Sequence, residues 1–160
     1  MKNEKWNMRF LMLLAITSVV SASCSVKPEP IHYGEDNCVH CAMTIMDTRY
    51  GTEIVTDKGK VFKFDSIECL VEFLQEDEVD SADVKLILVT PFNRPEDLVD
   101  ATASHYLHCK DLPSPMGMFL TAFESEATAM NFKEQFGGKV YCWEGLNRNF
   151  QVLRMKGAVD

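Results

Sequence analysis

Two cysteines, a histidine and a methionine lie close together in the stretch CVHCAM, residues 38–43. Thiolate and thioether sulfurs are the ligands that soft Cu(I) prefers, and this ion is satisfied with only two or three of them. In an extended segment, the side chains of Cys41 and Met43 point the same way. Cys38 returns to them across a tight turn. The spacing therefore predicts a Cu(I) site with Cys38, Cys41 and Met43 as ligands and His40 as a weaker candidate.

Three other uses of the two cysteines stay open. The Cys-x-x-Cys spacing also occurs in thiol–disulfide oxidoreductases, where a histidine between the cysteines stabilises a thiolate. A zinc site needs a second group of ligands, for which the candidates are His105, His108 and Cys109, although His108 would point away from the other two in a strand. A plain disulfide would leave Met43 without a role. We interpret Met46, the next methionine, as filler of the hydrophobic core.

The chain begins with a segment typical of an exported lipoprotein. Residues 1–23 have a basic start, a short apolar run and a small-residue end, which is the pattern of a secretory signal peptide. Cys24 follows at the position that carries lipid in bacterial lipoproteins. We therefore expect a protein of the cell envelope that faces the periplasm and is anchored to a membrane through lipid on Cys24. Residues 24–33, which contain two prolines, are predicted to form a tether.

Charge and cysteine count restrict the function further. Without residues 1–23 the chain loses three Lys or Arg and one Glu, so its net charge changes from −8 to −10, which argues against binding to nucleic acid. With Cys24 lipidated, an odd number of cysteines remains outside the cytoplasm, so a complete disulfide framework is excluded. At least one thiol must then be free, intermolecular or bound to metal. The sequence shows no nucleophile–base pair and no carboxylate pair, and we do not expect an enzyme.

The hydrophobic patterns predict an α+β fold of two small β-β-α-β units in tandem. In the first unit, residues 34–91, a helix is expected to begin at Asp65, with Glu68 three residues later as its capping-box partner. The second unit, residues 92–160, starts with a polar linker at 92–101 and ends with an amphipathic helix. The predicted strands are 49–56, 60–64, 84–90, 104–109, 117–123 and 139–143. One helix is predicted to begin at residue 65, and two further helices are predicted at 125–136 and 144–156.

These features resemble the NosL family of copper-binding lipoproteins, which are linked to the assembly of nitrous oxide reductase. The resemblance is carried by the lipoprotein start and by GEDNCVHCAM at 34–43, FKFDSIECL at 62–70, LPSPMGMFLTAF at 112–123 and FGGKVYCW at 136–143. Ala42 departs from the pattern, because the family usually has glycine before the methionine.

The resemblance implies a periplasmic Cu(I) metallochaperone of two β-β-α-β units. It implies Cys41 and Met43 as copper ligands, with Cys38 and, from the second unit, Met116 as further candidates. The partners that it implies are a copper-loading transporter complex and the apoprotein of nitrous oxide reductase. The alternatives from other classes are an envelope thiol–disulfide oxidoreductase that uses Cys38 and Cys41, and a zinc-stabilised interaction module.

Overall fold

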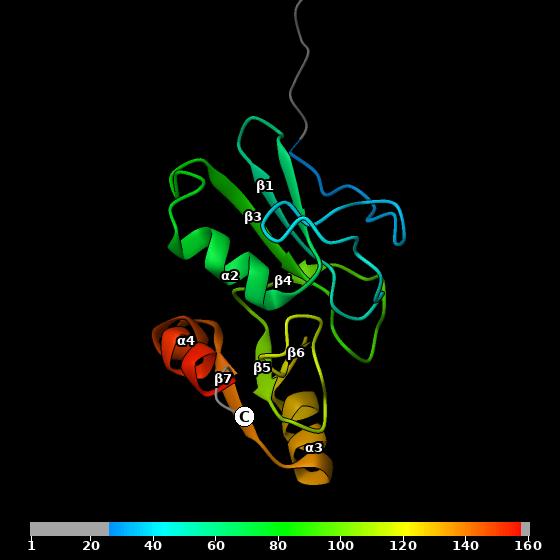
Figure 1. Cartoon of the computed structure of the whole chain (residues 1–160), viewed down its shortest axis with the longest axis vertical. Coiled ribbons are helices and arrows are strands. Elements are labelled where there is room, and N and C mark those ends of the chain that lie inside the picture. The colour runs from blue at the N-terminus through cyan, green and yellow to red at the C-terminus, as the bar shows by residue number, and fades with distance from the viewer. Residues whose placement is uncertain (1–25, 158–160) are drawn as a thin grey trace, which may run out of the picture.

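A computed structural model of the chain describes residues 26–157, and Figure 1 shows two units stacked along the long axis. The first unit contains a four-stranded antiparallel sheet in the order β2-β1-β3-β4. Its elements are β1 (Thr52–Thr56), β2 (Val61–Phe64), α2 (Ile67–Gln75), β3 (Val84–Val89) and the short β4 (Val99–Asp100). The linker predicted at 92–101 thus ends in a strand that joins the first sheet.

The second unit repeats the order strand, strand, helix, strand. Its three-stranded antiparallel sheet has the order β6-β5-β7. The elements are β5 (His105–His108), β6 (Leu120–Phe123), α3 (Glu126–Phe136), β7 (Lys139–Cys142) and the final helix α4 (Trp143–Gly157). The predicted α+β class and the two β-β-α-β units are confirmed. The predicted signal peptide and Cys24 lie outside the described residues.

Helices α2 and α3 begin with the same kind of cap. Ser66 and Ser125 have extended backbones, and their hydroxyls accept hydrogen bonds from the N–H groups of Cys69 and Thr128. This geometry satisfies one of the backbone donors that a helix start leaves without a partner. The prediction of Asp65 as the cap was therefore wrong by one residue. Because Ser66 caps α2, the Asp65 side chain is left for another contact.

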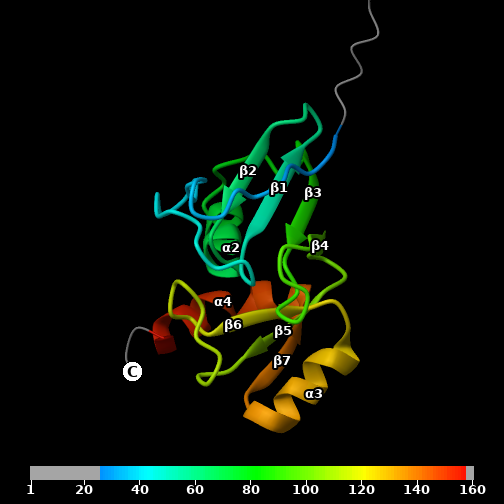
Figure 2. The ribbon, with the colours of Figure 1, turned by 90° about the vertical axis from the view of Figure 1, so that its right-hand side faces the viewer.

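Helix α2 lies between the two units, with one side on the first sheet and another against β6. Helices α3 and α4 cover opposite sides of the second sheet, as Figure 2 shows. The buried α4 residues Leu146, Phe150 and Leu153 recur at helical spacing and join the same apolar cluster as the α2 residues Leu70 and Phe73. The units therefore share one core, and α2 is its central helix.

The second half of the predicted tether lies against the first unit. The backbone N–H of Glu29 donates to both carboxylate oxygens of Glu53 on β1, at 3.1 and 3.3 Å, and Lys63 donates to the carbonyl of Pro30. Burial raises the pKa of Glu53 to about 7. Among residues 26–157, no helix has the length and apolar character needed to cross a bilayer.

Candidate metal centre

The Cys-x-x-Cys segment forms a narrow two-stranded loop before β1. Asn37 and Thr44 are paired antiparallel, and the next pair is closed by a 2.8 Å hydrogen bond from the N–H of Cys38 to the carbonyl of Met43. The N–H of Ala42 donates to the carbonyl of Cys38, so residues 38–42 form a single tight turn. Ala42 closes this turn with a φ of 62°, in the left-handed region. The turn returns the chain on itself and brings Cys41 beside Cys38.

The register of this loop decides which methionine lies near the cysteines. Residues directly opposite in an antiparallel pair project on the same face, so Met43 lies on the face of Cys38. Side chains alternate along a strand, so Ile45 shares that face and Met46 does not. Ile45 is buried and Met46 is 69% exposed. The interpretation of Met46 as core filler was therefore wrong.

Helix α2 adds two more ligand groups to the two cysteines of the loop. The three thiol sulfurs of Cys38, Cys41 and Cys69 and a carboxylate oxygen of Asp65 all lie within 4.8 Å of one another. Asp65 precedes the helix cap, and Cys69 lies in the first turn of the helix. Cys38, Cys69 and Asp65 are buried, whereas Cys41 is partly exposed. The four donor atoms thus form a largely buried cluster that reaches solvent at Cys41.

The surroundings of Cys38 favour a thiolate. The Cys69 thiol donates a hydrogen bond that lowers the pKa of Cys38 to about 6, and the backbone N–H groups of Cys41, Asp65 and His40 act in the same direction against the effect of burial. The same hydrogen bond, followed by burial, raises the pKa of Cys69. Burial is the main cause that raises the pKa of Cys41. These contacts therefore favour the thiolate form at Cys38 and the protonated form at Cys41 and Cys69. A metal that binds all three sulfurs must displace the protons that remain.

His40, the weaker candidate, is directed toward α2. Its Nε2 lies 3.0 Å from Oε2 of Glu72, and its Nδ1 lies 3.8 Å from Oε2 of Glu76. Glu72 also pairs with Arg154 of α4, at 3.0 Å. His40 is not part of the group of four ligand atoms. These polar contacts connect the turn of the Cys-x-x-Cys loop to α2, and Arg154 connects α2 to the second unit.

Met43 and Met116 both lie at the surface, with 53% and 37% of their residue area exposed. Met116 belongs to the loop before β6, which is fastened to α2 by a buried carboxylate. The hydroxyl of Ser114 donates to Oε1 of Glu68 and accepts from the N–H of Phe119 at 2.9 Å. Glu68 precedes Cys69 in the chain, so the loop that carries Met116 is held at the first turn of the helix that carries Cys69.

The sequence-based reasoning missed Asp65 and Cys69 as site residues. Asp65 was interpreted as a helix cap, and no role was assigned to Cys69. Two signals in the sequence could have identified them. The odd number of cysteines means that at least one cysteine is not in an intramolecular disulfide. The segment FDSIEC at 64–69 places a carboxylate and a cysteine together at a helix start. All five cysteines of the described residues are free thiols.

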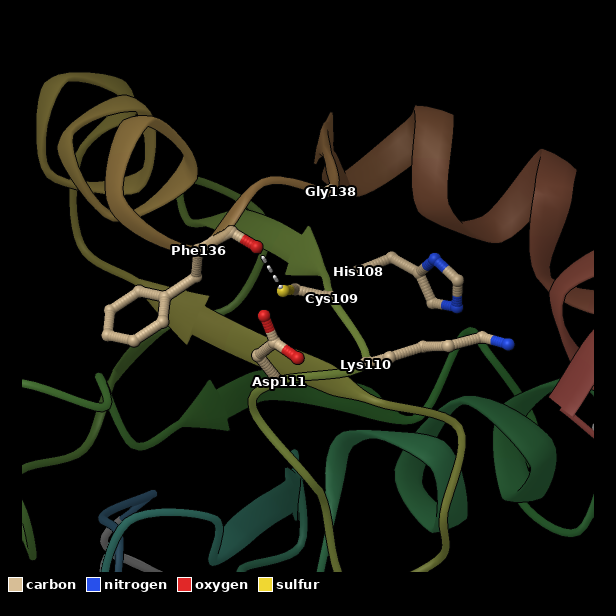
Figure 3. Close-up of a pocket in the computed structure, with 6 residues that line it drawn as sticks. All are labelled: His108, Cys109, Lys110, Asp111, Phe136 and Gly138. Carbon is tan, nitrogen blue, oxygen red and sulfur yellow. Dashed lines mark hydrogen bonds between the residues drawn. The ribbon is translucent and has the colours of Figure 1, made fainter.

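The ligands suggested for a zinc site in the second unit do not converge. His105 and Cys142 are paired across β5 and β7, and Cys109 follows β5. Figure 3 shows the Cys109 thiol and the His108 imidazole directed to opposite sides of the chain, with the thiol donating to the carbonyl of Phe136 at 3.1 Å. His108, Cys109 and Phe136 line a cavity of about 280 Å³, together with Asp111. Neither histidine nor Cys109 belongs to the group of metal-ligating atoms found in the first unit.

Comparisons with known proteins agree with this architecture. The sequence model of the NosL family matches residues 30–150. Among solved structures, the chain is similar to the crystal structure of the copper chaperone NosL from Shewanella denitrificans, with 24% sequence identity and a TM-score of 0.64. The similarity covers 75% of this chain and 95% of the other. A search of curated proteins found no match.

Proposed function

Because the chain belongs to the NosL family, we propose that it is a copper chaperone that carries Cu(I) on the sulfurs gathered between its first loop and α2. The observation that carries this proposal is the set of three thiols within 4.8 Å, two buried and one partly exposed. Membership of this family agrees with the expectation that the protein is not an enzyme. Its function is then to bind a metal ion and pass it on.

The donor types fit Cu(I) in its low coordination numbers. Three thiolates supply a trigonal site, and three soft sulfurs are sufficient for this ion. Cys38 and Cys69 hold the ion from the buried side, and Cys41 holds it at the opening. Met43, on the face of Cys38 and half exposed, supplies a thioether at the rim. Met116 is the candidate from the second unit, and His40 serves chiefly to tie the loop to Glu72.

The asymmetric burial supports transfer by ligand exchange. An incoming sulfur from a partner can approach only where the site is open, at Cys41 and Met43. A two- or three-coordinate ion accepts that ligand before an old one leaves, so copper is never released into water. The exposed sulfurs then leave first and the buried pair last. The backbone N–H groups around Cys38 stabilise the thiolate that remains.

Location and partners extend the proposal. Lipid on Cys24 would hold the protein to a membrane, facing the periplasm, and the tether contacts the first unit at Glu29. A copper-loading transporter complex would supply the ion, and the apoprotein of nitrous oxide reductase would receive it. These assignments rest on the lipoprotein pattern of the sequence and on its resemblance to the family.

The proposal is tested by Cu(I) titration of the reduced protein against a chromophoric chelator, in the absence of oxygen and in competition with Zn(II). We expect one Cu(I) per chain, bound more tightly than Zn(II). Cys41→Ser and Cys69→Ser should each weaken Cu(I) binding, and Met43→Ala should weaken it less. Cys142→Ser is the matched control, because Cys142 is an exposed thiol outside the cluster. If the Cys142 variant loses as much affinity as the cluster variants, or if wild type binds no Cu(I), the proposal is wrong.

A thiol–disulfide oxidoreductase is the second candidate, favoured by the lowered pKa of Cys38. In that chemistry the thiolate must reach a substrate disulfide, and accessibility controls its reactivity. Here the residue with the thiolate is only 2% exposed, and the accessible residue, Cys41, has a raised pKa. The lowered pKa and the solvent accessibility thus belong to different cysteines, which favours metal binding over disulfide exchange. Rapid reduction of a protein disulfide by the thiol form, dependent on Cys38 and Cys41 alone, would support the oxidoreductase instead.

A further inference from the structure

Residues 29–33, which were predicted as part of the tether, form a strap across the outer face of the first sheet. Side chains alternate along β1, so Ile54 packs into the core with α2 and Glu53 points to the other side. The strap crosses the sheet on that other side, away from α2, as Figure 1 and Figure 2 show. Glu53 is fully buried there. The strap thus separates the Glu53 carboxyl group from water.

Two polar contacts hold the strap to neighbouring strands. The backbone N–H of Glu29 donates to both carboxylate oxygens of Glu53 on β1, at 3.1 and 3.3 Å. The ammonium group of Lys63 on β2 donates to the carbonyl of Pro30 at 2.8 Å. Glu53 and Lys63 are direct partners in the register of the two strands. A single pair of side chains on the sheet therefore holds the backbone of the strap.

The apolar side chains of the strap rest on Gly51, just before β1. A Cβ atom at this position would lie 2.6 Å from Oη of Tyr33 and 2.8 Å from Cδ1 of Ile31. The fit is close, but both side chains are only partly buried. A segment with few buried apolar contacts opens locally at a lower free energy than the sheet beneath it. The strap can therefore detach while the first unit stays folded.

The charges that face Glu53 do not balance when its carboxyl group ionises. The strap contributes Glu29, the loop before β1 contributes Asp36, and β2 contributes Lys63, whereas the partner of Glu53 on β3 is the apolar Leu88. Lys63 already pairs with Asp36 at 2.8 Å and lies 3.9 Å from the carboxylate of Glu29. An ionised Glu53 is thus a third carboxylate beside one ammonium group, in a place closed to water. Burial is the main cause that raises the pKa of Glu53 to about 7.

We propose that the strap is a releasable, pH-dependent clasp, which covers the sheet while Glu53 is protonated and detaches more readily when the Glu53 carboxylate is ionised. A neutral carboxyl group is covered without burying a charge, so docking is strongest at low pH. Docking then weakens as the pH rises from about 4.5, the ordinary pKa, to about 7. With lipid on Cys24, which belongs to the proposed function above, release frees five more residues between the anchor and the fold. Five extended residues span at most roughly 16–18 Å.

Amide hydrogen exchange of the reduced, metal-free protein, followed by NMR, tests the clasp. The reporter is the N–H of Glu29, because its hydrogen bond to Glu53 exists only while the strap is docked. After correction for the intrinsic effect of pH on exchange, its protection factor should fall roughly 50–100-fold between about pH 5 and pH 8. At each pH this protection factor should also be lower than those of the paired amides of β1 and β3, since the strap opens without the sheet.

Glu53→Gln keeps the size of the side chain and removes its ionisation. We expect the protection factor of Glu29 to be independent of pH in this variant. Glu35→Gln is the matched control, because Glu35 is an exposed glutamate that follows the strap, and this variant should keep the dependence of wild type.

Three results would overturn the inference. The first is a protection factor of Glu29 that does not change with pH in wild type. The second is the same fall in Glu53→Gln, because another group would then control the strap. The third is equal protection of Glu29 and of the sheet amides, because the strap would then open only when the whole unit unfolds. The exchange measurement needs neither lipid nor copper, so failure of the clasp leaves the proposed function standing, and an unmodified Cys24 leaves the clasp standing.

Discussion

Ala42→Gly should stabilise the protein, although it removes a methyl group. Ala42 has a φ of 62° at the end of the Cys38–Ala42 turn. An L-residue in this region pays about 1–2 kcal/mol, because its Cβ crowds the following carbonyl oxygen. Glycine avoids that cost but loses about 0.4–1 kcal/mol through the greater freedom of the unfolded chain. The net gain is about 0.5–1 kcal/mol.

The measurement is urea and thermal unfolding of the reduced, metal-free protein. A gain of this size raises Tm by about 2–4 °C for a chain of roughly this length. Cu(I) affinity should not change, because the substitution leaves every sulfur in place. Ala127→Gly is the matched control. Ala127 is exposed in the first turn of α3, where glycine is a poorer helix former and costs up to about 1 kcal/mol. The same change of residue should therefore have opposite signs at the two positions. Equal losses of stability in both variants would refute the reasoning.

Three further predictions follow from the described contacts and from the sequence. Burial raises the pKa of Glu53 to about 7 from an ordinary value of 4.5, so the folded state holds a proton that the unfolded state releases, and stability should fall as pH rises from about 4.5 to 7. Glu53→Gln should flatten that decline in urea unfolding measured across this pH range, and a decline of unchanged steepness would assign it to other groups. Ser114→Ala should lower the free energy of unfolding by about 1–3 kcal/mol, because it leaves the buried carboxylate of Glu68 without its hydroxyl donor. A loss below the error of the unfolding curves would mean that water replaces the hydroxyl. Mass spectrometry of membrane-extracted protein should show a diacylglyceryl adduct on Cys24 as the first residue, and cleavage elsewhere would contradict the lipoprotein assignment.

Much of the fold was accessible from the sequence because the signals are local. The β-branched and aromatic runs of β1 and β2, the apolar run of β3, the helical spacing in α2 and α4, and Gly137 and Gly138 after α3 each act over a few neighbouring positions. The start of α2 was misplaced by one residue because Asp65 and Ser66 are both good capping residues. The cap is the residue whose backbone is extended just before the helix, here Ser66, and the sequence alone does not show which of two adjacent capping residues that is.

The pair Cys38 and Cys41 could likewise be recognised from spacing, since a turn of five residues must bring them together. The odd number of cysteines also showed that at least one cysteine cannot be in an intramolecular disulfide. The sequence did not determine the remaining members of the cluster. Asp65 and Cys69 join it because β2 leads the chain into α2 beside the loop, so that the first turn of the helix meets the two cysteines. The directions of His40 toward Glu72 and of Met46 toward solvent depend in the same way on packing between distant segments, which local spacing does not encode. Composition thus determined which chemistry the chain can perform, and the tertiary structure decided which residues perform it.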